Sequence, residues 1–275
     1  MWTLSGFADE IDKDFETQLQ VLGKLGVRNV EFRSAWGVNV LDLTDEQLTE
    51  VKTLLDRHGV AVSALGSPIG KIGINDPFEP HLERMRRALD VAETLGTSYI
   101  RIFSFFIPKG EDPARYRDEV LRRMAALAAE VGDRPVVLAH ENEKEIYGDI
   151  PSRCLDLIES VGSEKLRTTW DAANFVQCGV RPHTEGFAQL RPYLEYVQIK
   201  DAILATGEVV PAGEGDGEML DTLRALKADG FDGYFSLEPH LQSAGKFGGY
   251  SGADQFERAH KAFTGLLNSE GIEFA

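Results

Sequence analysis

Short apolar runs alternate with longer segments of helical periodicity along the whole chain. The short runs predict strands. Each is followed by a stretch in which apolar residues recur at three- and four-residue steps, as in a helix that covers a sheet with one face. The predicted strands span residues 3–8, 27–32, 60–65, 99–103, 135–139, 166–170, 196–199 and 234–237.

Local signals mark the ends of several predicted helices. Gly26 follows a helix that ends near Leu25, and Gly96 follows one that ends at Leu95. Glycine suits a helix C-terminus because it adopts the left-handed conformation without strain. Residues 44–47 read Thr-Asp-Glu-Gln, which is the pattern of a capping box at a helix start.

Eight strand–helix units with no block of strands alone favour a closed parallel barrel. We therefore predict an α/β fold, a (β/α)8 TIM barrel in which residues 1–275 form a single domain; such barrels commonly use ~250 residues. An open, doubly wound sheet would place a GxGxxG motif after the first strand, but residues 8–12 read Ala-Asp-Glu-Ile-Asp. The glycine-rich segment 211–217 contains Glu214 and Asp216, which would repel a phosphate, and we interpret it as a loop at the barrel mouth.

Composition and charge narrow the classes of partner. The formal net charge is −16, which argues against nucleic acid because its binders carry basic surfaces. The two cysteines lack CxxC spacing, so neither a disulfide framework nor a thiolate metal site is expected. The start of the chain does not resemble a signal peptide, and no apolar run reaches the ~18 residues of a membrane helix. We expect a cytoplasmic protein without membrane association; its outer helices are compatible with a homo-oligomer.

Oxygen-bearing side chains stand at the ends of four successive predicted strands. They are Glu141, Asp171, Gln198 and Glu238, separated by 30, 27 and 40 residues. A strand and its return helix take ~30 residues in this fold, and the active site lies at the carboxyl ends of the strands. The four side chains are therefore expected to converge at one mouth.

Three carboxylates and one amide oxygen form a hard ligand set. Such ligands suit Mn²⁺ or Mg²⁺ better than Zn²⁺, which favours imidazole and thiolate. A bound dication would polarise a substrate carbonyl and acidify the neighbouring C–H, and a ligand carboxylate with a free oxygen could move the proton. The pattern predicts a metal-dependent enzyme.

Further polar residues follow strands and are candidates for substrate binding, although each also has a structural interpretation. Arg33 and Lys71 could hold substrate oxygens or serve as ordinary cations, Arg33 as a partner of Glu31. Lys200 is expected to pair with Asp201 at the mouth and to contact substrate. The other candidates are Glu143, which could line the pocket or orient a ligand, and His240, which could bind a sugar hydroxyl or assist proton transfer. His81 is expected at the surface.

Several motifs carry a resemblance to the xylose-isomerase-like sugar isomerase/epimerase superfamily, which includes ketose 3-epimerases and inosose dehydratases. The resembling segments are 30–33, 67–71, 140–143, 170–174, 199–201 and 237–240. The resemblance implies a TIM barrel with one divalent metal, Mn²⁺ first and Mg²⁺ or Co²⁺ as alternatives, bound by Glu141, Asp171, Gln198 and Glu238. It also implies that Glu141 and Glu238 are the acid/base pair.

Two positions depart from the family pattern. Gln198 stands where many members have histidine, and an amide is a weaker ligand that does not titrate. Asn174, three residues after the aspartate, also replaces a frequent histidine. Its amide can bind a substrate hydroxyl, so it remains a substrate-binding candidate, but it cannot deliver a proton.

The leading functional hypothesis is a divalent-metal-dependent isomerase or epimerase that acts on a small ketose or polyol derivative. A dehydratase or other β-eliminating lyase acting on a keto-sugar or inosose is the close alternative, because the same base and metal serve both reactions. A DNA-repair phosphodiesterase would need a basic groove and more histidines, and a non-catalytic sugar-binding protein is the remaining class. Specificity is expected to depend on loops around Arg33, Trp36, Phe105 and residues 246–251.

Overall fold

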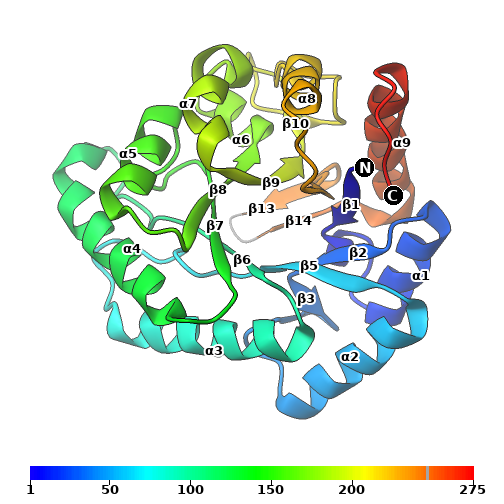
Figure 1. Ribbon diagram of the computed structural model, residues 1–275, viewed down its shortest axis with the longest axis horizontal. Helices are drawn as coiled ribbons and strands as arrows, with labels where there is room; N and C mark the ends of the chain where they lie inside the picture. Colours follow the sequence, from blue (N-terminus) through cyan, green and yellow to red (C-terminus); the bar gives the residue numbers. More distant parts are fainter. Residues whose placement is uncertain (246–247) are drawn as a thin grey trace.

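Eight parallel strands surrounded by helices form the body of the computed structural model, which describes residues 1–245 and 248–275 (Figure 1). This confirms the predicted single-domain (β/α)8 barrel. The barrel strands are β1 (Thr3–Gly6), β2 (Asn29–Phe32), β5 (Ala61–Gly66), β6 (Tyr99–Ile102), β7 (Val137–Glu141), β8 (Leu166–Asp171), β9 (Leu194–Ile199) and β12 (Tyr234–Leu237).

The strands pair in the order β1-β12-β9-β8-β7-β6-β5-β2. At the seam β1 and β2 lie against each other, and the Asn29 side chain donates to the Leu4 carbonyl at 3.3 Å. Beside this seam the C-terminal residues return to Trp2, whose N–H donates to the Glu273 carbonyl at 2.9 Å, so both termini lie together. The barrel is therefore nearly closed.

Amphipathic helices cover the outside of the barrel. In α3, for example, Met85, Leu89 and Ala92 are fully buried against the strands, as their spacing predicts. None of the helices in the described parts of the chain combines the length and apolar character needed to span a bilayer. The helices are α1 (Phe15–Leu25), α2 (Asp45–His58), α3 (Glu79–Leu95), α4 (Arg117–Val131), α5 (Pro151–Val161), α6 (Ala172–Gln177), α7 (Ala188–Leu190), α8 (Met219–Ala228) and α9 (Gly252–Ser269).

Short hairpins extend the loops that follow three of the barrel strands. They are β3 (Ser34–Ala35) with β4 (Val38–Asn39), β10 (Asp201–Ala202) with β11 (Val209–Val210), and β13 (Ser243–Gly245) with β14 (Gly248–Tyr250). Part of the segment 246–251, which we expected to influence specificity, lies outside the described residues, namely positions 246 and 247. The hairpins build up the rim at the carboxyl ends of the strands.

Strand boundaries differ from the predicted ones by at most two residues, and those of β12 agree at both ends. The largest shift is in β7, which begins at Val137 instead of position 135 and continues to Glu141. Pro135 has no N–H to donate to a neighbouring strand, so it precedes the ladder. Glu141 and Asp171 are therefore the last residues of their strands and not the first residues of loops.

The loop after β5 is held against β6 by His81, which was wrongly expected at the surface. The Gly70 N–H donates to His81 Nε2 at 2.7 Å, and only 5% of His81 is exposed. Gly70 has φ +89°, and a Cβ there would lie 2.0 Å from the Phe103 carbonyl oxygen, so only glycine fits. The loop that carries Lys71 is thus fixed by a neutral imidazole.

This contact predicts a pH dependence of folding. Burial, with Arg84 and Arg123 nearby, lowers the pKa of His81 to about 4, whereas an unfolded histidine titrates near 6.5. The stabilisation is complete above pH ~6.5 and is lost as pH falls towards 4, at up to ~1.4 kcal/mol per pH unit. Urea unfolding of wild type and His81→Gln across this range should show a steeper pH dependence for wild type. Parallel stability curves would contradict a buried neutral His81.

Candidate active site

Four oxygen-bearing side chains meet where β7, β8, β9 and β12 end. Glu141, Asp171, Gln198 and Glu238 are all at most 3% exposed. One carboxylate oxygen from each of Glu141, Asp171 and Glu238 lies within 4.8 Å of the other two. Gln198 stands beside Asp171 in the register of β8 and β9. The structure thus brings the four predicted ligands to one mouth.

The Gln198 amide is oriented by Glu31 at the end of β2. Gln198 Nε2 donates to Glu31 Oε1 at 3.1 Å, which leaves Gln198 Oε1 buried without a hydrogen-bond partner. Burial raises the pKa of Glu31 to about 8. A buried carbonyl oxygen without a donor is costly. The amide is therefore held with its oxygen available for a ligand.

Three buried cations neutralise the carboxylates. Lys200 Nζ lies 3.0 Å from Asp171 Oδ2 and 2.8 Å from Glu238 Oε2. Arg101 Nη1 lies 2.6 Å from Glu141 Oε2, and Arg33 Nη1 lies 3.0 Å from Glu238 Oε1. Arg33 pairs with Asp9 as well, at 2.8 Å, and not with Glu31.

The prediction of an ion pair between Lys200 and Asp201 is wrong. The Asp201 carboxylate instead accepts backbone N–H groups from Gly213, Gly215 and Gly217 at 2.8–3.1 Å. A Cβ at Gly215 or Gly217 would lie 2.5 or 2.6 Å from Asp201 Oδ1. Successive side chains of an extended chain point in opposite directions, so Lys200 faces the barrel axis while Asp201 holds the glycine-rich loop.

Asn174 contacts two of the predicted metal ligands, Asp171 and Glu141. Its backbone N–H donates to Asp171 Oδ1 at 2.9 Å, as expected for an N-cap aspartate. Its side-chain amide donates to Glu141 Oε1 at 3.0 Å and to the Asn142 carbonyl at 2.9 Å. Both amide hydrogens are thus engaged, which makes Asn174 an anchor for Glu141.

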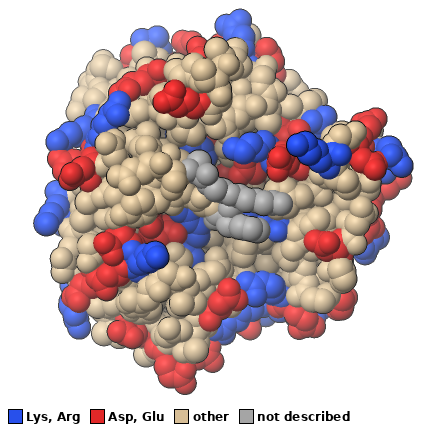
Figure 2. All heavy atoms as spheres, turned by 180° about the vertical axis from the view of Figure 1, so that it is seen from behind, with Lys and Arg blue, Asp and Glu red and all other residues tan. Residues whose placement is uncertain are grey.

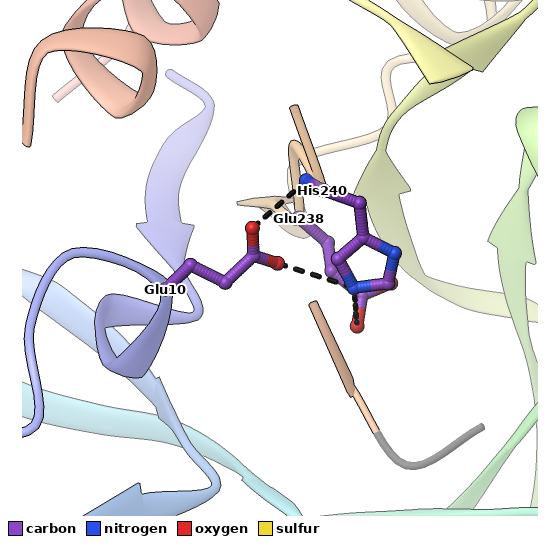
Figure 3. Close-up of side chains that lie close together, drawn as sticks. All are labelled: Glu10, Glu238 and His240. Atoms are coloured by element: carbon purple, nitrogen blue, oxygen red, sulfur yellow. Dashed lines mark hydrogen bonds and ion pairs between the residues drawn. The ribbon is translucent and has the colours of Figure 1, made fainter. Parts of the chain in front are cut away.

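Glu10 is a site residue that the sequence analysis missed (Figure 3). Its Oε2 accepts the His240 backbone N–H and the Ser251 hydroxyl, each at 2.8 Å. His240 Nε2 lies 3.2 Å from Glu10 Oε1 and 3.4 Å from Glu238 Oε1, and His240 has φ +49°. Glu10 lies four residues after the end of β1, on the side of the barrel where the four predicted ligands stand, so a search for acidic residues after each predicted strand could have identified it.

Lys71 completes the polar rim. Its Nζ lies 3.4 Å from Glu143 Oε2 and 4.1 Å from the centre of the Phe103 ring. The two predicted substrate-binding residues Lys71 and Glu143 are therefore partners of each other, and both stand beside the cluster of carboxylates.

Burial and neighbouring charges shift the pKa values of the three clustered carboxyl groups. Burial raises the pKa of Asp171 to about 7 and also raises that of Glu141, despite their cationic neighbours. Burial opposes ionisation of Glu238 too, but Lys200, His240 and Arg33 hold its pKa well below the usual range. Burial is the largest cause of both raised pKa values, so a cation bound between Glu141 and Asp171 would favour their charged forms. The clustered carboxylates of Glu141, Asp171 and Glu238, together with the unpartnered Gln198 oxygen, could hold a metal ion.

The sequence profile described as "Xylose isomerase-like TIM barrel" matches residues 19–263. The chain belongs to this family. A relative from Actinoplanes sp., 2-epi-5-epi-valiolone 7-phosphate 2-epimerase, is 30% identical over 181 residues, which are 65% of this chain. The match spans just under two thirds of that relative's length, 64%.

Solved structures of xylose isomerase-like barrels share the fold. A D-tagatose 3-epimerase-like protein superimposes with a TM-score of 0.76 at 16% identity, covering 98% of this chain and 100% of the other. A xylose isomerase-like TIM barrel protein from Mycobacterium smegmatis, in complex with magnesium, gives 0.70 at 21% identity, covering 97% and 98%. At these identities the likeness concerns the fold alone.

Lys200 and a metal ion would compete for Asp171 and Glu238. Lys200→Met removes the competing charge while keeping a long side chain, so affinity for Mn²⁺ should rise about tenfold or more. Lys144→Met is a matched control, because Lys144 is exposed and its Nζ binds Gln177 at 2.8 Å. Calorimetric titration with Mn²⁺ measures both. Unchanged or weaker affinity in Lys200→Met would contradict this competition.

Proposed function

We propose that this xylose isomerase-like barrel is a divalent-metal-dependent sugar isomerase or epimerase. It would move a proton at the carbon next to the carbonyl of a small ketose or polyol derivative. The observation that carries the proposal is the pair Glu141 and Glu238, whose carboxylates approach within 4.8 Å of each other and of Asp171 at the barrel mouth.

The proposed metal ligands are Glu141, Asp171, Gln198 and Glu238, with Mn²⁺ as the expected ion and Mg²⁺ or Co²⁺ as alternatives. The ion would polarise the substrate carbonyl and make the neighbouring C–H more acidic. The hard oxygen donors and the orientation that Glu31 imposes on Gln198 support this choice.

The chain's own residues hold the two glutamates in place from separate directions. Arg101 and Asn174 anchor Glu141, whereas Arg33 and Lys200 anchor Glu238. Two carboxylates fixed in this way can face one substrate carbon, so one removes a proton and the other returns one. Each positioned acid or base typically contributes ~10²–10⁴-fold to the rate.

Neighbouring polar groups would hold the substrate's oxygens. Lys200 and His240 stand next to Glu238 and are proposed to contact hydroxyl or carbonyl oxygens. Fixed donors of this kind need no reorganisation during the reaction. Asn174 is proposed to act through Glu141, since both of its amide hydrogens are engaged.

The Actinoplanes relative supports epimerisation over elimination, because that protein is a 2-epimerase by name. Elimination of a β-oxygen shares the proton-abstraction step, so a dehydratase remains the alternative product outcome. Product analysis separates the two, since elimination releases water whereas epimerisation exchanges isomers.

Glu141→Gln and Glu238→Gln test the proton-transfer pair. Glutamine preserves size and an oxygen atom but removes the base, so turnover should fall ~10²-fold or more. Exchange of the substrate's α-hydrogen with D₂O, followed by NMR over a panel of ketoses and their phosphates with Mn²⁺, reports C–H cleavage for both epimerisation and elimination. At least one variant should abolish exchange.

The control for this experiment is Glu164→Gln, because Glu164 is exposed in the turn before β8, at the opposite end of the barrel strands from the mouth. It should exchange like wild type. Wild-type exchange in both Glu141→Gln and Glu238→Gln would show that neither glutamate is the base.

A further inference from the structure

We propose that a pocket beside the two glutamates binds an anionic group of the substrate, a phosphate or a carboxylate. This inference rests on the proposed function and specifies its substrate class. The pocket has a volume of about 250 Å³ and opens where β2, β5 and β6 end. Its lining residues are Arg33, Asn39, Asp42, Gly66, Ser67, Pro68, Lys71, Arg84 and Arg101.

The lining of this pocket is cationic although the chain is acidic. Arg33, Lys71, Arg84 and Arg101 contribute four positive charges, against one carboxylate, Asp42, in a chain of net charge −16. Figure 2 shows blue lysine and arginine side chains, interspersed with red acidic ones, around the central hollow of this face. Like charges gathered in a concave site focus the potential and attract an oppositely charged ligand.

The cations retain capacity for an added anion. Arg101 is 4% exposed, and its Nε has no hydrogen-bond partner among the residues that the structure describes. Lys71 Nζ lies 3.4 Å from the Glu143 carboxylate, and burial lowers the pKa of Lys71, so a second anion beside it would favour its charged form. The Arg84–Asp42 pair is exposed on both sides, and such pairs contribute little, so a ligand can displace Asp42 at small cost.

The pocket adjoins the proposed chemistry through two shared residues. Arg33 binds both Asp9 and Glu238, and Arg101 binds Glu141. An anionic group held between Lys71 and Arg84 would therefore place the rest of a small substrate beside both glutamates. Binding energy from a remote group can orient the reacting carbon in this way. The Actinoplanes relative is named for a phosphorylated substrate, 2-epi-5-epi-valiolone 7-phosphate, which agrees with this class.

Three small ligands separate the sources of negative charge: glycerol 3-phosphate, glycerate and glycerol. We expect at least one anion to bind about tenfold or more tightly than glycerol, measured by calorimetry with and without Mn²⁺. A preference for glycerol 3-phosphate over glycerate would identify phosphate as the group. Equal affinity for glycerol and both anions would overturn the proposal.

Lys71→Gln and Arg84→Gln should each reduce the preference for the anion severalfold. Arg86→Gln is the matched control, since Arg86 lies on the same helix with 43% of its side chain exposed, against 41% for Arg84, and pairs with Glu83 and Glu130 outside the pocket. It should keep the wild-type preference. Because Arg84 is exposed, its variant remains informative even if Lys71→Gln fails to fold.

A preference that survives in both pocket variants would place the anion elsewhere, for example on the metal, and would overturn the proposal. Binding requires no turnover, so the two proposals fail separately. Loss of solvent exchange with an intact anion preference would refute the isomerase, whereas intact exchange without that preference would refute the pocket.

Discussion

The central constraint on this structure is the burial of carboxylates at the mouth of the barrel. Glu141, Asp171 and Glu238 are removed from water, and an isolated buried carboxylate is very unfavourable. Three buried cations reach them from β2, β6 and the end of β9, and Asn174 adds a neutral donor. Removing one member would leave a charge uncompensated, so these residues form one interdependent network.

The loops around the mouth also supply hydrogen-bond partners to buried carboxylates. The Glu10 carboxylate accepts hydrogen bonds from both His240 and Ser251, and so it connects the two ends of the loop between them. The Asp201 carboxylate accepts three glycine N–H groups from another loop. Both carboxylates hold loops at the rim, whereas Lys200 faces the carboxylates of Asp171 and Glu238. Rigid placement of this kind is what a site needs if two glutamates are to act on one carbon.

Cationic and anionic residues also divide the mouth into two regions. On the side of β7 and β8, the carboxylate oxygens of Glu141 and Asp171 lie close together, an arrangement that suits a divalent ion. On the side of β2 and β5, Arg33, Lys71 and Arg84 line a pocket together, which suits an anionic substituent. A substrate with a carbonyl at one end and an acidic group at the other would match both regions.

The barrel could be predicted from the sequence because apolar periodicity is a local signal. The convergence of the strand ends could be predicted because the spacing of Glu141, Asp171, Gln198 and Glu238 matches the length of one strand–helix unit. The ion-pair and hydrogen-bond partners of these four residues could not be predicted in this way. Arg101 lies inside β6 and reads as a strand residue, and its contact with Glu141 spans 40 positions. Likewise, the pairing of Lys200 with Asp171 and Glu238 depends on strand register, which a run such as 199–201 does not reveal.

The most direct test of the central claim is anomalous diffraction at the manganese edge from crystals soaked in Mn²⁺. The account predicts one peak within coordination distance, ~2.0–2.6 Å, of oxygens from Glu141, Asp171, Gln198 and Glu238. A peak between Glu10 and His240 instead, or one that excludes Gln198 Oε1, would contradict it.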